Sequence, residues 1–296
     1  MGATSEEIQI SYDRGNEFFR LWLDTRMNYT SALFCDPPHA PASDDSLEVA
    51  QVRKLAFLHD AARIERAHRV LDIGCGWGAN LEYLAVDRGV KEGHGITLSP
   101  AQVEEIRRRK LPGVTVDCVS YADFRPEQPF DAVVSIGMLE HVVSPEQARA
   151  GKAIEVYRDY FRLAHRFTRP GAHFGLQTIV RDRIPRVSED VRDLAWVTRT
   201  IFPGSLAPRL EDVIVAVAPY WEVRELHARR DDYQRTSEIW RSRLRANEAT
   251  IRARFGDDSF ELYDRYLGIC VRNFEAGYLS LCRFSLRRRD EQRAKS

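Results

Sequence analysis

The chain has 296 residues, 44% of them hydrophobic, and its 44 basic residues balance 44 acidic ones, so it can bury a sizeable core and gives no reason to expect a nucleic-acid partner. Its five cysteines are widely spaced and form no Cys-x-x-Cys pair, which argues against a disulfide framework and against a zinc site. Residues 1–9 lack the apolar stretch of a secretion signal, and no run approaches 18 apolar residues, so we expect a cytoplasmic protein without a membrane span.

The first part of the chain, from residue 8 to about residue 68, is predicted to be helical and loop material. It contains an aromatic-rich stretch over residues 12–22 and a proline-containing loop over residues 36–41. Because it precedes the first clear strand, we interpret residues 1–68 as an N-terminal helical lid.

From residue 69 onward, strand and helix patterns alternate. Ser99 and Pro100 are a typical helix start, because serine caps the first turn and proline fits its first position. We expect helices over residues 79–86, from residue 99, and over about 145–168, and strands over residues 70–73, 93–98, 114–119, 130–136 and 174–180. This alternation predicts an α/β fold with a doubly wound, mostly parallel sheet.

The pattern breaks between about residues 181 and 219. Two further strands are expected over residues 221–226 and 278–286, separated by a charged helical stretch over about 233–274. Residues 69–296 are therefore interpreted as one α/β domain, with a substrate-binding cap inserted within about residues 181–275.

The first strand runs directly into Gly74, Gly76 and Gly78. Glycines at such a turn let backbone N–H groups and a helix N-terminus approach a ligand closely. The spacing G-x-G-x-G differs from the dinucleotide pattern G-x-G-x-x-G, and no acidic residue ends the second strand, which disfavours a nicotinamide enzyme. A glycine-rich turn without a ligand is the remaining alternative.

Several segments together resemble the S-adenosylmethionine-dependent methyltransferases, and within them the cyclopropane fatty acid synthase and mycolic acid synthase group. The resemblance covers nearly the whole chain. The segments that carry it are SYDRGNEFFRLWLD (11–24), MNYTSALF (27–34), VLDIGCGWG (70–78), GITLSPAQ (95–102), SIGMLEHV (135–142), LQTI (176–179), IFPG (201–204) and YQRT (233–236). It implies a class I methyltransferase fold with a seven-stranded sheet.

The resemblance also implies positions that contact the cofactor. Gly74 and Gly76 correspond to residues against its methionine part, and Asp72 to one that orients the glycine turn. The remaining matching positions are Tyr29 and Thr30 closing over the methionine end, Thr97 and Gln102 at the ribose and neighbouring groups, Tyr121 over adenine, and Asp123 at the adenine amino group. From the residue type alone, Tyr121 could instead be an aromatic side chain packed at a strand end.

Family members that cyclopropanate an alkene transfer a methyl group and then remove a proton, for which the family uses a bound bicarbonate. The positions that match its holders are Ser31, the backbone of Ile136, Glu140, Gln177 and Tyr233. Ser31 stands where many members have Cys and Gln177 where many have His, so bicarbonate binding here is an open expectation. Both side chains can hydrogen-bond an anion, but neither carries a positive charge.

Glu140, at the end of an apolar strand, is expected to have a perturbed pKa and to lie in the pocket. Its alternative role is to cap a helix start. His141 is a candidate catalytic group or a structural histidine. Tyr233 is favoured as a site residue because the segment around it breaks helix periodicity and falls in the expected cap.

The cap contributes large apolar side chains that suit a hydrophobic acceptor and stabilise positive charge. The favoured function is transfer of a methyl or methylene group to an unsaturated or electron-rich carbon of a hydrophobic small molecule or lipid, with transient membrane-surface contact as an option. The alternatives are N- or C-methylation of a small secondary metabolite, and a non-catalytic module that binds S-adenosylmethionine. The oligomeric state and the acceptor are left undetermined by the sequence.

Overall fold

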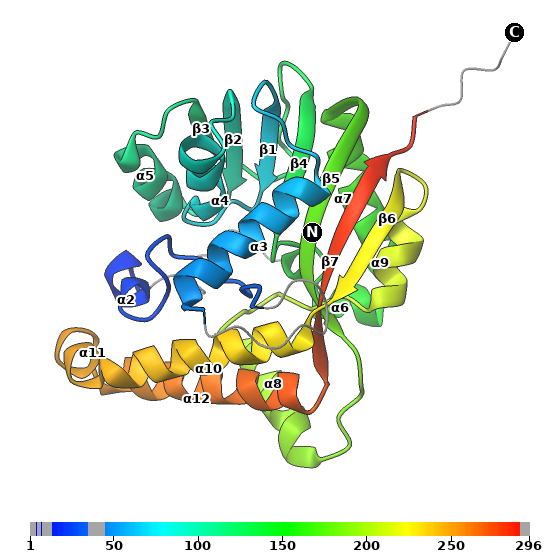
Figure 1. Cartoon of the computed structure of the whole chain (residues 1–296). Helices are drawn as coiled ribbons and strands as arrows, with labels where there is room; N and C mark the ends of the chain where they lie inside the picture. Colours follow the sequence, from blue (N-terminus) through cyan, green and yellow to red (C-terminus); the bar gives the residue numbers. More distant parts are fainter. Residues whose placement is uncertain (1–3, 5–6, 8–13, 35–44, 291–296) are drawn as a thin grey trace, which may run out of the picture.

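The computed structural model describes Thr4, Glu7 and residues 14–34 and 45–290. The predictions for residues 8–13 and 36–41 therefore lie outside the described residues. The centre of the molecule is a seven-stranded sheet with the order β3-β2-β1-β4-β5-β7-β6 (Figure 1). Its strands are β1 (Arg69–Ile73), β2 (Glu92–Thr97), β3 (Val114–Cys118), β4 (Phe130–Ile136), β5 (Thr168–Arg181), β6 (Trp221–Ala228) and β7 (Leu279–Arg288).

Strands β1 to β5 are parallel, and β7 runs antiparallel to both β5 and β6. The predicted doubly wound, mostly parallel sheet of seven strands is thus confirmed. Strands β5 and β7 extend beyond the predicted ranges, and they pair from His173 with Arg287 to Arg181 with Leu279. Strands β2 and β3 are added on one side of β1, and β4 and β5 on the other. The carboxyl ends of β1 and β4 therefore flank a crevice of the kind in which α/β proteins bind ligands.

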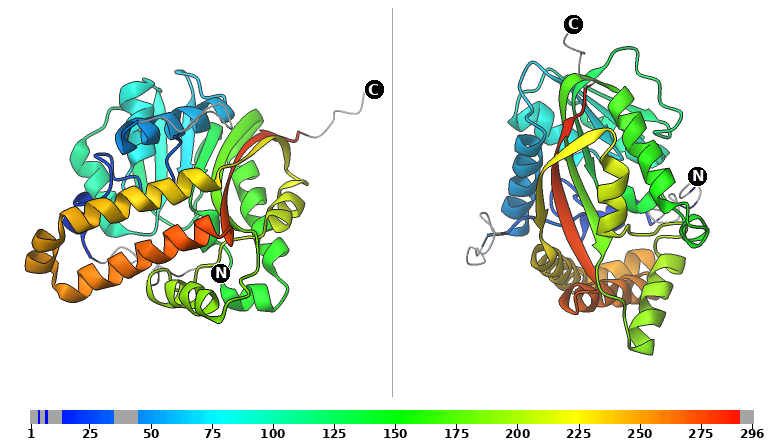
Figure 2. Two further views of the ribbon diagram at one scale, coloured as in Figure 1. Left: turned by 60° about the horizontal axis from the view of Figure 1, so that its bottom comes forward. Right: turned by 90° about the vertical axis from the view of Figure 1, so that its right-hand side faces the viewer.

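Helices cover both faces of the sheet, which the right-hand view of Figure 2 shows edge-on. One face carries α3 (Leu47–Ala61), α4 (Ala79–Glu82) with a π-helical turn (Tyr83–Asp87), and α5 (Pro100–Arg109). The other face carries α7 (Ala153–Arg166) and α9 (Leu210–Val217). Along β1, Val70 packs on the first face and Leu71 on the second, as the twofold repeat of a strand requires.

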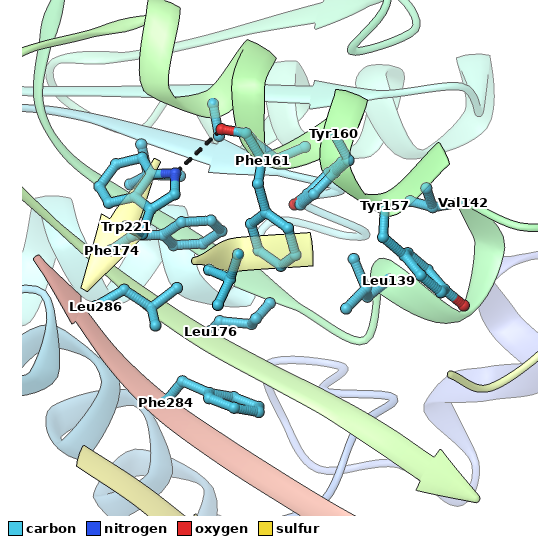
Figure 3. Close-up of a cluster of buried hydrophobic side chains, with 14 of the residues drawn as sticks. Leu139, Val142, Tyr157, Tyr160, Phe161, Phe174, Leu176, Trp221, Phe284 and Leu286 are labelled. Atoms are coloured by element: carbon cyan, nitrogen blue, oxygen red, sulfur yellow. Dashed lines mark hydrogen bonds between the residues drawn. The ribbon is translucent and has the colours of Figure 1, made fainter. Parts of the chain in front are cut away.

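The larger core lies between the sheet and α7 (Figure 3). Trp221 of β6 is completely buried there and donates its indole N–H to the backbone oxygen of Phe161 at 3.0 Å. On the opposite face α3 approaches β5 so closely that a Cβ on Gly175 would lie 2.4 Å from the backbone oxygen of Leu58. This close contact fixes α3 over the centre of the sheet.

Two helix predictions were wrong in detail. The helix expected over residues 145–168 is divided into α6 (Pro145–Arg149) and α7, with Gly151 in a left-handed conformation between them. The stretch expected to lack a pattern contains α8 (Ser188–Thr200) and α9. No residue of α8 is fully buried.

A third helical group extends below the sheet in Figure 1. Helices α10 (Arg230–Ala246) and α12 (Asp257–Glu275) lie side by side, joined by α11 (Glu248–Phe255). The short helix α2 (Asn16–Arg20) packs on them through an aromatic cluster in which the rings of Phe18 and Tyr263 are 4.7 Å apart. The N-terminal residues and the α10–α12 helices therefore share one apolar core.

Candidate active site

A large cavity of about 1130 Å³ lies at the carboxyl ends of β1, β2, β4 and β5. One half is formed by residues that follow these strands, together with residues 27–30 of the N-terminal segment. The other half is formed by residues 179–185, 194–198 and 202–209, with tyrosines from α10 and α12. We call these the cofactor half and the acceptor half.

In the cofactor half, the turn after β1 is open to the cavity. Gly74 and Gly76 have φ angles of +79° and +54°, which favour glycine, and both line the cavity. The N–H of Gly74 donates to the backbone oxygen of Ile96 at 3.0 Å, which ties the turn to β2. A Cβ on Gly76 would meet no atom within 4 Å, so its backbone is accessible to a ligand.

Asp72, at the end of β1, lies beside the turn and also lines the cavity. Its carboxylate accepts a hydrogen bond of 3.1 Å from Asn80, whose other amide atom contacts His59 at 2.8 Å. Burial raises the pKa of Asp72 to about 7. A carboxyl group in this position supports the turn and offers a polar contact to a ligand.

Thr97 and Gln102 lie together at the end of β2 and the start of α5. The Thr97 hydroxyl donates to the Gln102 side-chain oxygen at 2.7 Å, and both residues line the cavity. The predicted helix N-cap is present, since the Ser99 hydroxyl accepts the N–H of Gln102 at 3.4 Å. This N-cap and the hydrogen bond to Thr97 hold Gln102 at the cavity wall.

The loop after β3 brings Tyr121 and Asp123 to the same cavity. The Tyr121 ring is partly buried and contacts the Tyr160 ring edge-on at 5.1 Å. Burial raises the pKa of Tyr121 to about 12, so its hydroxyl is neutral at physiological pH. Ile136, at the end of β4, completes this part of the wall.

The N-terminal segment covers the cavity with Tyr29 and Thr30. The Tyr29 ring packs among aromatic side chains, including Trp240 at 5.4 Å and Phe202 at 6.2 Å. A Cβ on Gly137 would lie 2.9 Å from the Thr30 methyl group, so the segment lies directly against the end of β4. Both residues are thus brought to the cofactor half.

Glu140 lies in a short 3₁₀ turn (Leu139–His141) between the two halves and is 8% exposed. Its Oε1 accepts the N–H of Ile179 at 2.6 Å. Its Oε2 is buried and has no hydrogen-bond partner within the part of the chain that the structure describes. Burial raises the pKa of the carboxyl to about 7, as expected for a group kept from water inside a pocket.

His141 is next to Glu140 and lines the cavity. Its Nδ1 is 2.7 Å from the Ser205 hydroxyl, and burial lowers its pKa to about 4. The imidazole is therefore neutral near pH 7.

Tyr233 lines the acceptor half from the first turn of α10. The expectation that its segment breaks helix periodicity was wrong, because the α10 helix includes it. Its ring stacks on Phe274 of α12 with centroids 4.4 Å apart. Packing between the two helices, rather than an irregular loop, fixes its position.

Ser31 and Gln177 do not line the cavity. The Ser31 hydroxyl donates to the backbone oxygen of Ala32, and the Gln177 side-chain oxygen accepts Nε of Arg283 at 2.7 Å. The five positions expected to hold bicarbonate are therefore divided, with only Ile136, Glu140 and Tyr233 on the cavity wall. Bicarbonate binding at these positions stays a prediction, and we derive no step through it.

Arg283 was missed by the sequence analysis. It is fully buried on β7, where it contacts Gln177 on the neighbouring strand and donates to the backbone oxygen of Ala32 at 2.8 Å. Its guanidinium group also forms an ion pair of 3.5 Å with the carboxylate of Asp232 on α10. An arginine between the apolar residues Cys282 and Phe284 of a strand was the available signal, but its partners come from three distant segments. Lys54 and Asn80, which also line the cavity, were missed because no motif includes them.

The comparisons with known proteins agree with this geometry. The Mycolic acid cyclopropane synthetase family matches residues 2–284. The chain belongs to this family. Cyclopropane mycolic acid synthase 2 of Mycobacterium bovis is 30% identical over 95% of this chain and 94% of its own length.

Two solved structures of family members are also similar. The cyclopropane synthase MmaA2 from Mycobacterium tuberculosis has a TM-score of 0.86 and 26% identity, covering 97% of this chain and 99% of its own. The cyclopropane synthase CmaA1 complexed with SAH and CTAB has a TM-score of 0.85 and 26% identity, with the same coverage. The predicted class I methyltransferase fold is confirmed.

Membership of the mycolic acid cyclopropane synthetase family makes the protein an S-adenosylmethionine-dependent transferase. The residues available to hold the cofactor are the glycine turn, the end of β2, the loop after β3 and the N-terminal segment. Among the described residues, no His, Cys, Asp and Glu side chains group in a way that could hold a metal ion. No helix in the described ranges is long and apolar enough to cross a membrane.

Proposed function

We propose that the enzyme transfers a methyl or methylene group from S-adenosylmethionine to an unsaturated or electron-rich carbon of a hydrophobic acceptor, such as an acyl chain. The observation that carries this proposal is the single cavity that joins the glycine turn to an apolar and aromatic half, with Glu140 between them. The cofactor supplies an electrophilic methyl group. The protein's contribution is to hold both partners in line and to exclude water.

The acceptor half supports a hydrophobic substrate. Apolar residues predominate along its wall, and the rings of Tyr233, Tyr266 and Phe202 border it. Aromatic faces stabilise positive charge that develops on a substrate. This matters because methyl addition to an alkene leaves a carbocation, and ring closure then requires the loss of a proton.

We assign the removal of that proton to Glu140. Glu140 lies at the border of the two halves, its Oε2 has no hydrogen-bond partner among the described residues, and its pKa of about 7 leaves a substantial carboxylate fraction at neutral pH. The C–H bond electrons close the three-membered ring and the proton moves to the carboxylate. Tyr233 and His141 would assist by orienting the acceptor, while Ser31 and Gln177 would act indirectly from behind the wall.

The roles of the cofactor-contacting residues are proposed from their place in the same cavity. Gly74, Gly76 and Asp72 would bind the methionine part and Thr97 with Gln102 the ribose. Tyr121 and Asp123 would contact adenine. Tyr29 and Thr30 would close the site from the N-terminal segment.

We further propose that residues 1–68 act as a lid and that residues 181–275 contain the substrate-binding cap. Residues 27–30 and several residues between 181 and 209 line the cavity, which supports these roles. A location in the cytoplasm and transient contact with a membrane surface remain predictions.

The test is incubation of the protein with S-adenosylmethionine and unsaturated lipids, followed by mass spectrometry. We expect a gain of about 14 mass units from one added carbon, and product structure must then separate a ring from a methyl branch. No gain on any lipid acceptor would contradict the proposal.

A second candidate is N- or C-methylation of a small secondary metabolite. It is favoured because Ser31 and Gln177 differ from the residues expected for cyclopropanation and do not line the cavity, whereas Ile136, Glu140 and Tyr233 do. Methylated small molecules without lipid products would support it.

Cofactor binding without transfer to either class of acceptor would support a non-catalytic module. The buried carboxyl group of Glu140 argues against such a module.

A further inference from the structure

Lys54 is a buried cation in the wall of the cofactor half. It lies on α3, is 1% exposed and lines the cavity. Its ammonium group donates to the side-chain oxygen of Asn28 at 2.9 Å and to the hydroxyl of Thr30 at 3.2 Å. Both acceptors are neutral, and both also line the cavity.

Two carboxylates are near Lys54, but each is held by other groups. Asp24 accepts the backbone N–H of Asn28 at 2.6 Å and its side-chain amide at 2.9 Å. Asp72 accepts the amide of Asn80. Neither forms an ion pair with Lys54, which makes none within the described ranges of the chain. A buried ammonium without an ion-pair partner is costly, and a bound anion offsets that cost.

The groups around Lys54 make its charge sensitive to a nearby anion. Burial and, to a smaller extent, the charge of Arg283 lower the pKa of Lys54 to about 7, against the opposite effects of Asp24 and Asp72. His59, the next titratable group on α3, is buried with its pKa lowered to about 4 and is neutral. A ligand carboxylate beside Lys54 would restore its charged form.

The cofactor of this enzyme carries such a group, because its methionine part ends in a carboxylate. The Lys54 ammonium has three N–H donors, of which two are used by Asn28 and Thr30. Gly74, Gly76 and Thr30 line the same half of the cavity. The third donor can therefore be used by the cofactor without breaking the contacts that hold the N-terminal segment.

We propose that Lys54 binds the carboxylate of S-adenosylmethionine and couples it to the N-terminal segment through Asn28 and Thr30. Lys54 is then a specificity-determining residue for a cofactor with an intact amino-acid end. The inference concerns cofactor binding and does not depend on which acceptor is used, so it can fail while the proposed transfer stands.

The test compares S-adenosylmethionine with its decarboxylated form, which keeps the sulfonium, adenosine and amino groups. Calorimetric binding is measured without an acceptor for the natural protein and for Lys54→Met. The variant should bind S-adenosylmethionine about 30-fold more weakly, the effect of losing a charge-assisted hydrogen bond. Its affinity for the decarboxylated form should change less than threefold. An equal loss for both ligands would overturn the proposal.

Gln51→Leu is the matched control. Gln51 is buried on the same helix and donates to the backbone oxygen of Thr30 at 2.8 Å, so it anchors the same segment without a charge. Its loss should weaken both ligands to a similar degree. Selective loss of S-adenosylmethionine in this variant as well would show that the segment, and not the Lys54 charge, recognises the carboxylate.

A second measurement uses the natural protein and remains informative if Lys54→Met does not fold. At pH 8, a lysine with a pKa near 7 is mostly neutral and must take up a proton to bind a carboxylate. Calorimetry in buffers of different ionisation enthalpy should show that the protein takes up more protons on binding S-adenosylmethionine than on binding the decarboxylated form. Asp72 faces both ligands alike, so equal proton uptake would contradict the role of Lys54.

Discussion

The cofactor half and the acceptor half of the cavity are built from different chemical groups. In the cofactor half, backbone groups of the glycine turn and polar side chains such as Asp72 and Gln102 converge from neighbouring strand ends. In the acceptor half, aromatic and aliphatic side chains come from β5, α8, α10 and α12. We therefore expect that mutations can change cofactor affinity and the transfer rate separately, with Glu140 at the border between the two halves.

The largest effect is expected for Glu140→Gln, which keeps the shape of the side chain but removes its ability to accept a proton. Transfer should slow by about 100-fold or more, the usual contribution of a general base. Cofactor affinity should change little, because Glu140 lies at the edge of the cofactor half. Glu155→Gln, on the exposed face of α7, is the control. Unchanged turnover in Glu140→Gln would break the assignment of the base.

The pH dependence should follow the same carboxyl group. Because its pKa is raised to about 7 and the base is the carboxylate, the transfer rate should rise as pH increases through about 7 and then level off. Below that pKa the rate should fall by about tenfold per pH unit. Glu140→Gln should lack this rise. Rates measured at saturating cofactor separate it from the titration of Lys54, which affects binding.

Gly74→Ala should weaken cofactor binding by about tenfold, because a left-handed φ costs a non-glycine residue about 1–2 kcal/mol, the free protein can relieve this strain by moving the turn, and binding must reverse that movement. The new Cβ would also lie 3.0 Å from Met138, which must move. The transfer rate at saturating cofactor should be nearly unchanged. Gly151→Ala is the matched control, because its φ is +72° and it lies outside the cavity. A lower saturated rate in Gly74→Ala would show that the two halves are coupled.

Tyr121→Leu should have the smallest effect, about a fivefold loss of cofactor affinity, as expected for one aromatic stacking contact. Tyr220→Leu, a partly buried tyrosine outside the cavity, controls for a general loss of packing. Binding of 5′-methylthioadenosine, which keeps the adenosine part, should weaken to the same extent. If the affinity for that ligand is unaffected, Tyr121 does not cover adenine and is only packed at the strand end.

The sequence predicted the glycine turn and the helix start after β2, because the residues that form each of them are close in the chain. The glycine turn directly follows β1, and Ser99, Gln102 and Thr97 lie within six consecutive residues. Their hydrogen bonds are local, so residue types and spacing carry the information. The alternation of β1 to β5 with helices was predicted for the same reason.

The prediction was weaker where partners are distant. The hydrogen bond that Gln177 accepts from Arg283, which is 106 residues away, was not predicted. Tyr233 was expected in an irregular segment, whereas its place on α10 depends on stacking with Phe274 of α12. Helix α8 was also not predicted.

The fold class, the glycine turn and the family's cofactor could be inferred from the sequence, because strand periodicity and local motifs are properties of adjacent residues. Which candidate residues face one cavity became clear from the packed structure. It also placed Lys54 in the wall of the cofactor half and joined Arg283 to Gln177 and Ala32. The physical reason is that burial, unpaired charge and raised or lowered pKa values arise from groups that meet only after the sheet and its covering helices have packed.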